Sequence, residues 1–389
     1  MIDSIIIAIF TGMDSKRFNN LKIGLCVLEG VLTFAISLVF VISGLSLKLA
    51  ESIGTSVSGL YGIFIIYVLL AGFGLGILLF PLGYYKDFYL EHKYNLSNQT
   101  FFKWIFEDIK GLGVSLLIGI PILLAFYYTM LKFGNLWWLP FAILLFIVSV
   151  ILARVVPVFI LPLFYKITPI DNEELKSRIT ILAEEAGINV TDVYKFDMSK
   201  NTKKANAAFT GLGKSKRILL GDTLLENYTN DEIETVIAHE LGHYKKKHIV
   251  KNIIIGTVSS FLTLFIIANL YYLSLGWFGF QNITEIAALP ILTLWAMLIG
   301  LVQSPLTNII SRKFEYQADE YAILSTGKAE AFKATLEKLT DQNLGDKDPH
   351  PFIEWFFYSH PSIKNRIAAI DNFLSSDNTI KNNLKFEAN

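Results

Sequence analysis

Long apolar runs alternate with polar segments along this chain of 389 residues. A run of about 18 or more apolar residues is long enough to cross the hydrocarbon core of a bilayer as a helix. Such runs lie at residues 23–45, 60–84, 111–131, 136–156, 253–273 and 287–310. The pattern therefore predicts a mainly α-helical integral membrane protein with about six transmembrane helices.

Two polar blocks interrupt the spans. They divide the chain into a membrane region with four spans (1–156), a first polar block (157–251), two further spans (252–310) and a second polar block (311–389). Apolar spacing within the blocks predicts helices at 173–186, 312–325, 328–340 and 362–374, and β-like pieces at 190–196 and 217–220. We expect the two blocks to assemble into one soluble domain with a small β-sheet.

Composition agrees with a membrane protein and limits its partners. Hydrophobic residues make up 53% of the chain, charged residues 17%, and the mean hydropathy is +0.47, which is too apolar for an ordinary soluble protein. Lys and Arg gather before the first span and in the loop after the second, and other loops carry few. The positive-inside rule then places both termini and residues 239–243 on the cytoplasmic side. No basic block is large enough to indicate nucleic acid binding.

Residues 239–243 read His-Glu-Leu-Gly-His, an HExxH motif. On a helix, His239 and His243 share one face and can bind one Zn²⁺, and Glu240 is placed to take a proton from water. Thr229 and Glu232 have the spacing of a capping box, so the helix should begin near residue 231. The alternative interpretation is a surface helix with two unrelated histidines.

A catalytic zinc site needs a third protein ligand and an open position for water. The best candidate is Glu315 in the segment RKFEYQAD, because a helix there puts Glu315 and Asp319 on one face. Asp319 would then be the acceptor that orients a ligand imidazole. The alternative is a pair of solvated carboxylates on an exposed helix.

Taken together, the motifs resemble those of the CAAX prenyl protease 1 family of integral-membrane zinc metallopeptidases. HELGH is followed by a span, then by RKFEYQAD, then by SHPSIKNRI at 359–367. Further matches are EHKYNLSNQT at 91–100, PLFYKITPI at 162–170 and NAAFTG at 206–211. The resemblance extends over about residues 88–371. It implies a zincin-like metalloprotease domain with one Zn²⁺ per chain, acting on peptides or proteins that are prenylated or membrane-associated.

Carried over residue by residue, the resemblance implies functional roles. It makes His239, His243 and Glu315 the zinc ligands, Glu240 the general base and Asp319 the residue that supports a ligand. It also implies that His360 stabilises the tetrahedral intermediate. From the residues alone, a histidine before proline is more often a cap or turn residue.

The resemblance also implies that Asn206 and Ala207 lie on an edge strand that pairs with an extended peptide substrate. Without it, NAAFTG predicts only a short strand and a turn at Gly211 and Gly213. His248 lies five residues beyond His243, off its helical face, and is expected to point to the membrane interface. Arg366 either pairs with a site carboxylate or is a solvated helix charge.

The sequence thus predicts a membrane-embedded zinc metalloendopeptidase of the CAAX prenyl protease type. The Lys-, Asn- and Ile-rich composition suggests a bacterial cell membrane and a role in membrane protein quality control; in a eukaryote the location would be the endoplasmic reticulum membrane. The alternatives are an HtpX-type stress protease with the same catalytic set, and an inactive membrane scaffold or transporter that retains the zinc site. The complete ligand set with Glu240 argues against the inactive protein, because a structural zinc site has no use for a base.

Overall fold

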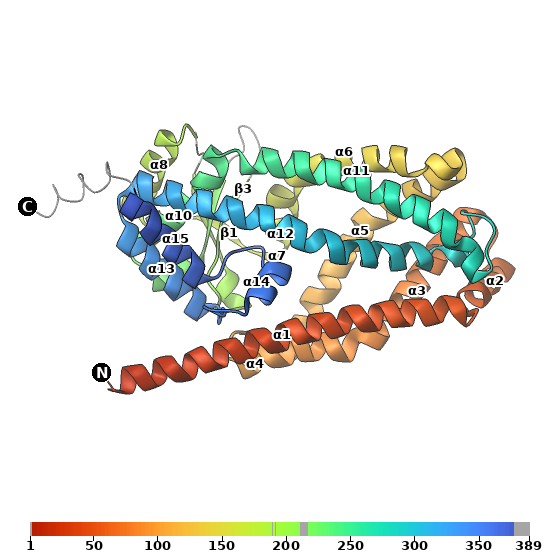
Figure 1. The fold of residues 1–389 in the computed structure, drawn as a ribbon, viewed down its shortest axis with the longest axis horizontal. Coiled ribbons are helices and arrows are strands. Elements are labelled where there is room, and N and C mark those ends of the chain that lie inside the picture. Colours follow the sequence, from red (N-terminus) through yellow and green to blue (C-terminus); the bar gives the residue numbers. More distant parts are fainter. Residues whose placement is uncertain (1, 189, 191, 211–216, 377–389) are drawn as a thin grey trace, which may run out of the picture.

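The computed structural model describes residues 2–188, 190, 192–210 and 217–376. A bundle of long helices forms one end of the elongated molecule, and a domain of shorter helices with a small sheet forms the other (Figure 1). Helix α1 begins at the end of the molecule that carries the sheet, and helix α15 lies at the same end (Figure 1). The residues after 376, where the sequence is polar and Asn-rich, lie outside the described part.

Six helical segments within the described residues are long and apolar enough to cross a membrane, which confirms the six predicted spans. They run over Asp14–Ile42, Leu60–Lys93, Phe101–Leu136, Trp138–Phe164, His248–Phe278 and Ile286–Thr326. Their main helices are α1 (Ile2–Ile42), α3 (Leu60–Gly83), α5 (Phe101–Phe133), α6 (Trp138–Val155), α11 (His248–Ser274) and α12 (Pro290–Thr326). The last of these continues without a break past residue 310, where the apolar run ends.

Short elements join and cap the long helices. They are α2 (Leu45–Ser56), α4 (Leu90–Lys93), α7 (Leu161–Phe164), the π-helices η1 (Tyr84–Tyr89) and η3 (Val156–Ile160), and the 3₁₀ turns η2 (Gly134–Leu136), η5 (Leu275–Phe278) and η6 (Ile286–Ala288). Helix α2 lies at the far end of the bundle (Figure 1). Its buried Ser46 donates to the carbonyl of Ala287 (2.5 Å) and bonds the hydroxyl of Tyr67 (2.6 Å). These bonds tie α2 to α3 and to the segment that precedes α12.

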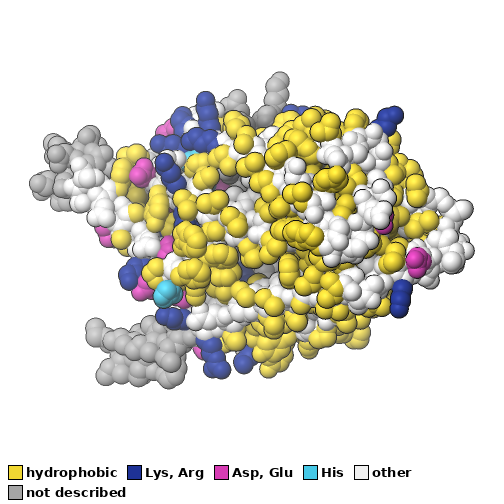
Figure 2. All heavy atoms as spheres, turned by 45° about the vertical axis from the view of Figure 1, so that its right-hand side comes forward, with side chains coloured by type: hydrophobic (Ala, Val, Ile, Leu, Met, Phe, Trp, Pro, Cys, Tyr) yellow, Lys and Arg dark blue, Asp and Glu magenta, His cyan; other side chains and the backbone are white. Residues whose placement is uncertain are grey.

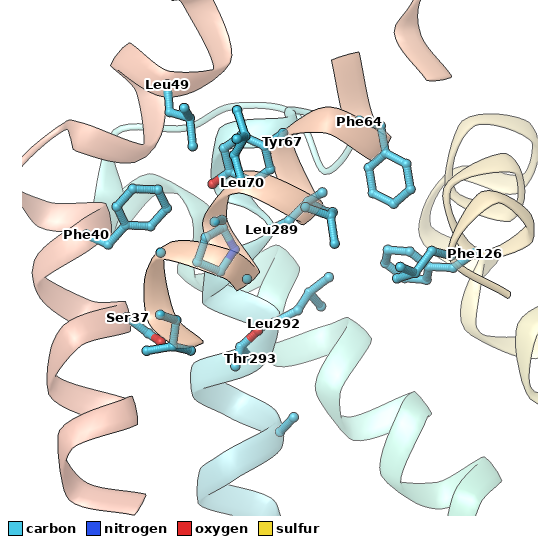
Figure 3. A pocket seen from close by; sticks show the side chains of 18 of the residues that line it. Ser37, Phe40, Leu49, Phe64, Tyr67, Leu70, Phe126, Leu289, Leu292 and Thr293 are labelled. Atoms are coloured by element: carbon cyan, nitrogen blue, oxygen red, sulfur yellow. The ribbon is translucent and has the colours of Figure 1, made fainter. Parts of the chain in front are cut away.

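Next to α2 the helices line an apolar cavity of about 1010 Å³ that opens to the outside of the bundle (Figure 3). Phe40 of α1, Tyr67 of α3, Phe126 of α5 and Leu292 of α12 contribute to its wall (Figure 3). None of its lining residues belongs to the two polar blocks. The cavity is therefore a feature of the membrane part.

The outer surface of the bundle is largely hydrocarbon. Figure 2 shows hydrophobic side chains spread over it, with Lys and Arg gathered where the bundle meets the other domain. Phe73, Leu117 and Phe159 are 67%, 77% and 68% exposed, respectively. So much exposed apolar surface would be unfavourable in water, and lipid is the solvent that suits it.

The two polar blocks fold into one domain around a shared core. Its helices are α8 (Glu173–Glu185), α9 (Asp222–Asn227), α10 (Asn230–Lys245), α13 (Ala329–Gln342), α14 (Pro351–Phe357) and α15 (Ile363–Ser376), with the 3₁₀ turn η4 (Met198–Lys200). The predicted helices at 173–186, 328–340 and 362–374 are confirmed as α8, α13 and α15. Leu175 and Ile237 from the first block pack with Phe332 and Ile370 from the second in one buried cluster.

The described strands form a four-stranded sheet in the order β1-β2-β4-β3. They are β1 (Ile167–Pro169), β2 (Val193–Phe196), β3 (Ala207–Thr210) and β4 (Arg217–Gly221). Strands β2 and β4, both predicted, pair in parallel, and the two other pairings are antiparallel. Strand β1 was not predicted, because three residues that include a proline carry little alternation.

Helices α10 and α12 approach each other closely at Gly242. A Cβ atom on Gly242 would lie 3.0 Å from the Cα and 3.1 Å from the carbonyl oxygen of Ala318. Both obstructing atoms belong to the backbone of α12, so only glycine permits this packing distance. Since α12 is one continuous helix, this contact joins the HExxH helix directly to a membrane span.

Replacing Gly242 by alanine should therefore separate α10 from α12. Forcing a methyl group into such a contact typically costs about 1–3 kcal/mol, so we expect Gly242→Ala to lower the thermal unfolding temperature in detergent and to weaken metal retention.

The matched control is Gly300→Ala on α12, because a Cβ there meets nothing within 4 Å. Unfolding temperature and metal content of Gly242→Ala equal to those of Gly300→Ala would contradict the close-packing account.

Candidate active site

The HExxH motif lies well inside α10. Thr229 Oγ accepts from the Glu232 amide (3.3 Å) and the Glu232 carboxylate accepts from the Thr229 amide (2.8 Å), which confirms the predicted capping box. This reciprocal cap fixes the helix start at residue 230, one position before the predicted one. One helical turn separates His239 from His243, and their Nε2 atoms lie 3.1 Å apart.

Glu315 meets both histidines from α12. Its carboxylate oxygens lie 3.3 Å from His239 Nε2 and 3.3 Å from His243 Nε2. Ligands arranged tetrahedrally at about 2.1 Å from zinc are about 3.4 Å from one another, so these separations suit a single ion of that size. Glu315 is buried, and its Oε2 finds no hydrogen-bond partner in the described part of the chain. A metal ion would satisfy that oxygen.

The donor set is that of a catalytic rather than a structural metal site. Two imidazole nitrogens and one carboxylate leave the fourth position of a tetrahedral ion for water or substrate. Among the residues that the structure describes, the group of ligand-type side chains within 4.8 Å of one another has three members, His239, His243 and Glu315.

Asp319 and Arg366 lie behind His239. Asp319 Oδ1 is 2.8 Å from His239 Nδ1, one helical turn beyond Glu315 on the same face of α12. Arg366 of α15 binds both carboxylate oxygens, with Nε 2.8 Å from Oδ2 and Nη2 2.5 Å from Oδ1. The sequence left two interpretations of Arg366 open. Because its side chain is only 11% exposed and binds Asp319, Arg366 pairs with a site carboxylate and is not a solvated helix charge.

The charges at this site depend on those contacts. Burial favours the neutral imidazole of His239, but the nearby carboxylates of Asp319 and Glu315 outweigh burial and raise the pKa of His239 to about 9. A metal ion binds the neutral ring, so it must displace this proton. Burial also favours the neutral form of Arg366, but the Asp319 carboxylate outweighs burial and raises the Arg366 pKa.

His360 approaches the ligand group from the solvent side. It lies between α14 and α15, its side chain is 65% exposed, and its Nε2 is 3.4 Å from Glu315 Oε1. Ser359 Oγ lies 3.0 Å from His360 Nδ1. A hydroxyl that donates to Nδ1 leaves the imidazole proton on Nε2, the nitrogen that faces the site. Glu240 directly follows His239 on α10, and its side chain is half-buried.

Strand β3 lies at the edge of the sheet, next to α10. Ala207 pairs with Leu220 of β4, and the carbonyl of Asn206 accepts from the Gly221 amide at 2.9 Å. The Phe209 ring contacts Tyr244 of α10, with 5.5 Å between ring centroids. Among the described strands β3 has a neighbour on one side only, so its other side offers backbone groups to an extended chain. The predicted turn at Gly211 and Gly213 lies outside the described residues.

The expectation for His248 was wrong. The side chain is 1% exposed and does not reach the membrane interface; its Nδ1 lies 3.0 Å from His243 Nδ1. Helical periodicity placed it off the face of His243, but Lys247 adopts a left-handed conformation (φ 57°) that ends α10 and turns the chain back. The spacing of the motif alone gave no signal for this turn.

The fold and the site define a membrane-embedded metallopeptidase. Residues 169–374 match the model of peptidase family M48, and residues 11–166 match the model described as CAAX prenyl protease N-terminal, five membrane helices. The chain belongs to peptidase family M48 and is similar to its CAAX prenyl protease 1 members. Over residues 11–166 it has four candidate spans and the short helix α2, within the part described by the structure.

Individual relatives agree with this membership. CAAX prenyl protease 1 of Saccharomyces cerevisiae is 35% identical over 312 residues, which is 75% of this chain and 68% of the yeast protein. The uncharacterized metalloprotease YhfN of Bacillus subtilis is 31% identical over 364 residues, 91% of this chain and 84% of that protein. The crystal structure of S. mikatae Ste24p superposes with a TM-score of 0.83 at 31% identity, covering 93% of this chain and 89% of that one.

Family membership confirms the predicted class: a multi-pass membrane metalloendopeptidase with peptide or protein substrates. The match of the N-terminal membrane region favours the prenyl-protease branch over an HtpX-type protease. The inactive scaffold or transporter is likewise not favoured.

Asp319 gives a direct test of this geometry. Removing the hydrogen-bond partner of a ligand histidine typically lowers metal affinity by about 10- to 100-fold. We expect Asp319→Asn to lower metal affinity by that amount. The new amide NH₂ group is a donor and would not suit the Arg366 guanidinium, which is also a donor. The measurement is metal competition with a chelator. Glu320→Gln, the same change one residue along α12, should keep wild-type affinity; equal affinities in both variants would contradict the assigned geometry.

Proposed function

We propose that this protein is a zinc endopeptidase whose single Zn²⁺ is held by His239, His243 and Glu315. The observation that supports this most strongly is the spacing of 3.1 to 3.3 Å between the candidate ligand atoms. These ligand atoms come from two residues of α10 and one residue of the membrane helix α12. Asp319, braced by Arg366, holds His239 in the orientation that presents Nε2 to the metal.

The residues around the ligands divide the chemistry among them. Bound zinc supplies Lewis acidity, which polarises a peptide carbonyl and lowers the pKa of water to about 7. Glu240 accepts a proton from the attacking water and passes it to the leaving amine. His360, with its proton held on Nε2 by the Ser359 hydroxyl, donates to the oxyanion of the tetrahedral intermediate.

Asn206 and Ala207 are proposed to bind the substrate main chain. An extended peptide that adds to the open side of β3 would continue the sheet, and backbone hydrogen bonds would hold it regardless of side-chain sequence. Because β3 packs beside α10, the bound peptide would run along the HExxH helix. This mode suits a protease that cleaves many different chains.

The substrates are proposed to be membrane-associated proteins, including prenylated proteins of the CAAX type. A role in quality control within a bacterial cell membrane, with the catalytic domain on the cytoplasmic side, agrees with the composition and with the distribution of Lys and Arg.

Two substitutions test the catalytic assignments. Loss of a general base typically lowers kcat by about 100- to 10,000-fold, so Glu240→Gln should lose that much peptidase activity and keep one metal ion per chain. His360→Ala should lose about 2.7–4 kcal/mol of transition-state stabilisation, mostly in kcat. Exposed Glu337→Gln serves as the control. Wild-type turnover by Glu240→Gln at full metal occupancy would contradict the mechanism.

Substrate class is tested with one peptide in two forms, unmodified and farnesylated at a C-terminal CAAX cysteine. A quality-control protease should cleave both, and the farnesylated form should show a KM at least about tenfold lower because the chain partitions into the detergent micelle or bilayer. Cleavage restricted to the farnesylated form would contradict the broad role and indicate a prenyl specialist.

A further inference from the structure

His248, the first residue of α11, contacts one residue of α10 and two residues of α12. Its Nδ1 lies 3.0 Å from His243 Nδ1, and its Nε2 lies 2.9 Å from Gln317 Oε1 of α12. Its ring stacks on Phe314 of α12, with 4.1 Å between centroids and 6° between planes. The side chain is buried, and both of its nitrogens are occupied.

If His243 binds a metal through Nε2, the distances determine where the protons lie. His243 turns its Nε2 toward His239 and Glu315, so that nitrogen must be free of a proton to bind a metal, and the proton of a neutral ring is then on Nδ1. The two Nδ1 atoms at 3.0 Å share one proton, so His243 donates and His248 accepts. The proton of neutral His248 therefore lies on Nε2 and is donated to the amide oxygen of Gln317.

We propose that His248 and Gln317 are positioning residues that hold His243 in the tautomer and orientation needed to bind the metal. The chain of hydrogen bonds runs from Gln317 through His248 to His243, and each member sets the proton position of the next. It does for His243 what Asp319 and Arg366 do for His239. This inference rests on the proposed function, because it takes His243 as a metal ligand.

The backbone supports this arrangement independently of the side chains. Lys247 has a φ of 57°, a left-handed backbone conformation that residues other than Gly and Asn rarely adopt. The turn at Lys246 and Lys247 closes α10, with both amides bonded back to carbonyls of that helix at 2.9 Å. It brings His248 back against His243, five residues away, which a continued helix would not do.

Two substitutions at position 248 separate hydrogen bonding from packing. His248→Phe keeps an aromatic ring that can stack on Phe314, but it removes the acceptor for His243. His248→Asn loses the ring but places an amide oxygen near the position of Nδ1. We expect His248→Phe to weaken metal affinity by about 10- to 100-fold, and His248→Asn to stay within a few-fold of wild type. A purely structural role predicts the reverse order.

Affinity is measured by competition between the purified full-length protein and a chelator, and the absorption spectrum of the Co²⁺-substituted protein reports ligand geometry. If His248→Phe fails to fold, Gln317→Leu takes its place, since it leaves His248 and the stack intact. Gln317→Leu should lower affinity and alter the Co²⁺ spectrum, whereas Gln317→Glu, which retains an acceptor oxygen, should preserve both. Unchanged affinity and spectrum in Gln317→Leu or His248→Phe would overturn the inference.

His243→Ala in the same assay tests the ligand assignment separately from the positioning role. If wild type binds one metal ion and His243→Ala does not, the ligand assignment stands and the variants at 248 and 317 decide the positioning role. If His243→Ala binds as tightly as wild type, the ligand assignment itself fails and the positioning role fails with it.

Discussion

The close contact between α10 and α12 at Gly242 is the constraint on which the rest of the site depends. Neither helix can hold a catalytic metal alone, because α10 offers two imidazoles and α12 one carboxylate. Backbone atoms of Ala318 would lie 3.0 to 3.1 Å from a Cβ on Gly242, so the helices meet without a side chain between them. That distance brings Glu315 within reach of both histidines.

Helix α12 organises the site on two of its faces. Glu315 and Asp319 lie one turn apart toward α10, where one approaches both histidines and the other supports His239. Gln317, between them in the sequence, contacts His248 at the start of α11. Helix α12 runs from residue 290 to residue 326, so one helix contains both the apolar membrane segment and the residues of the site. The membrane bundle thus acts as a scaffold for the site, beyond anchoring it.

Local signals in the sequence predicted a large part of this arrangement. The capping box at Thr229 and the apolar runs are properties of neighbouring residues, and each was found where expected. Glu315 could be selected because a catalytic zinc site needs a third protein ligand, and a carboxylate can supply it. The roles of Arg366 and His248 depended on contacts between distant elements or on one left-handed residue, and helix α2 carries too short a pattern to stand out beside the spans. Those features follow from tertiary packing, which periodicity does not encode.

The most direct test of the account is X-ray absorption at the zinc edge on the purified protein. We predict about one zinc per chain with only nitrogen and oxygen neighbours at about 2.0–2.2 Å, and the multiple-scattering signal of two imidazoles. His243→Ala should hold less than one zinc per chain, because it lacks one of the two imidazoles. A zinc shell with three imidazoles or with four protein ligands, or a protein without bound metal, would contradict the claim that α10 and α12 together form an open catalytic site.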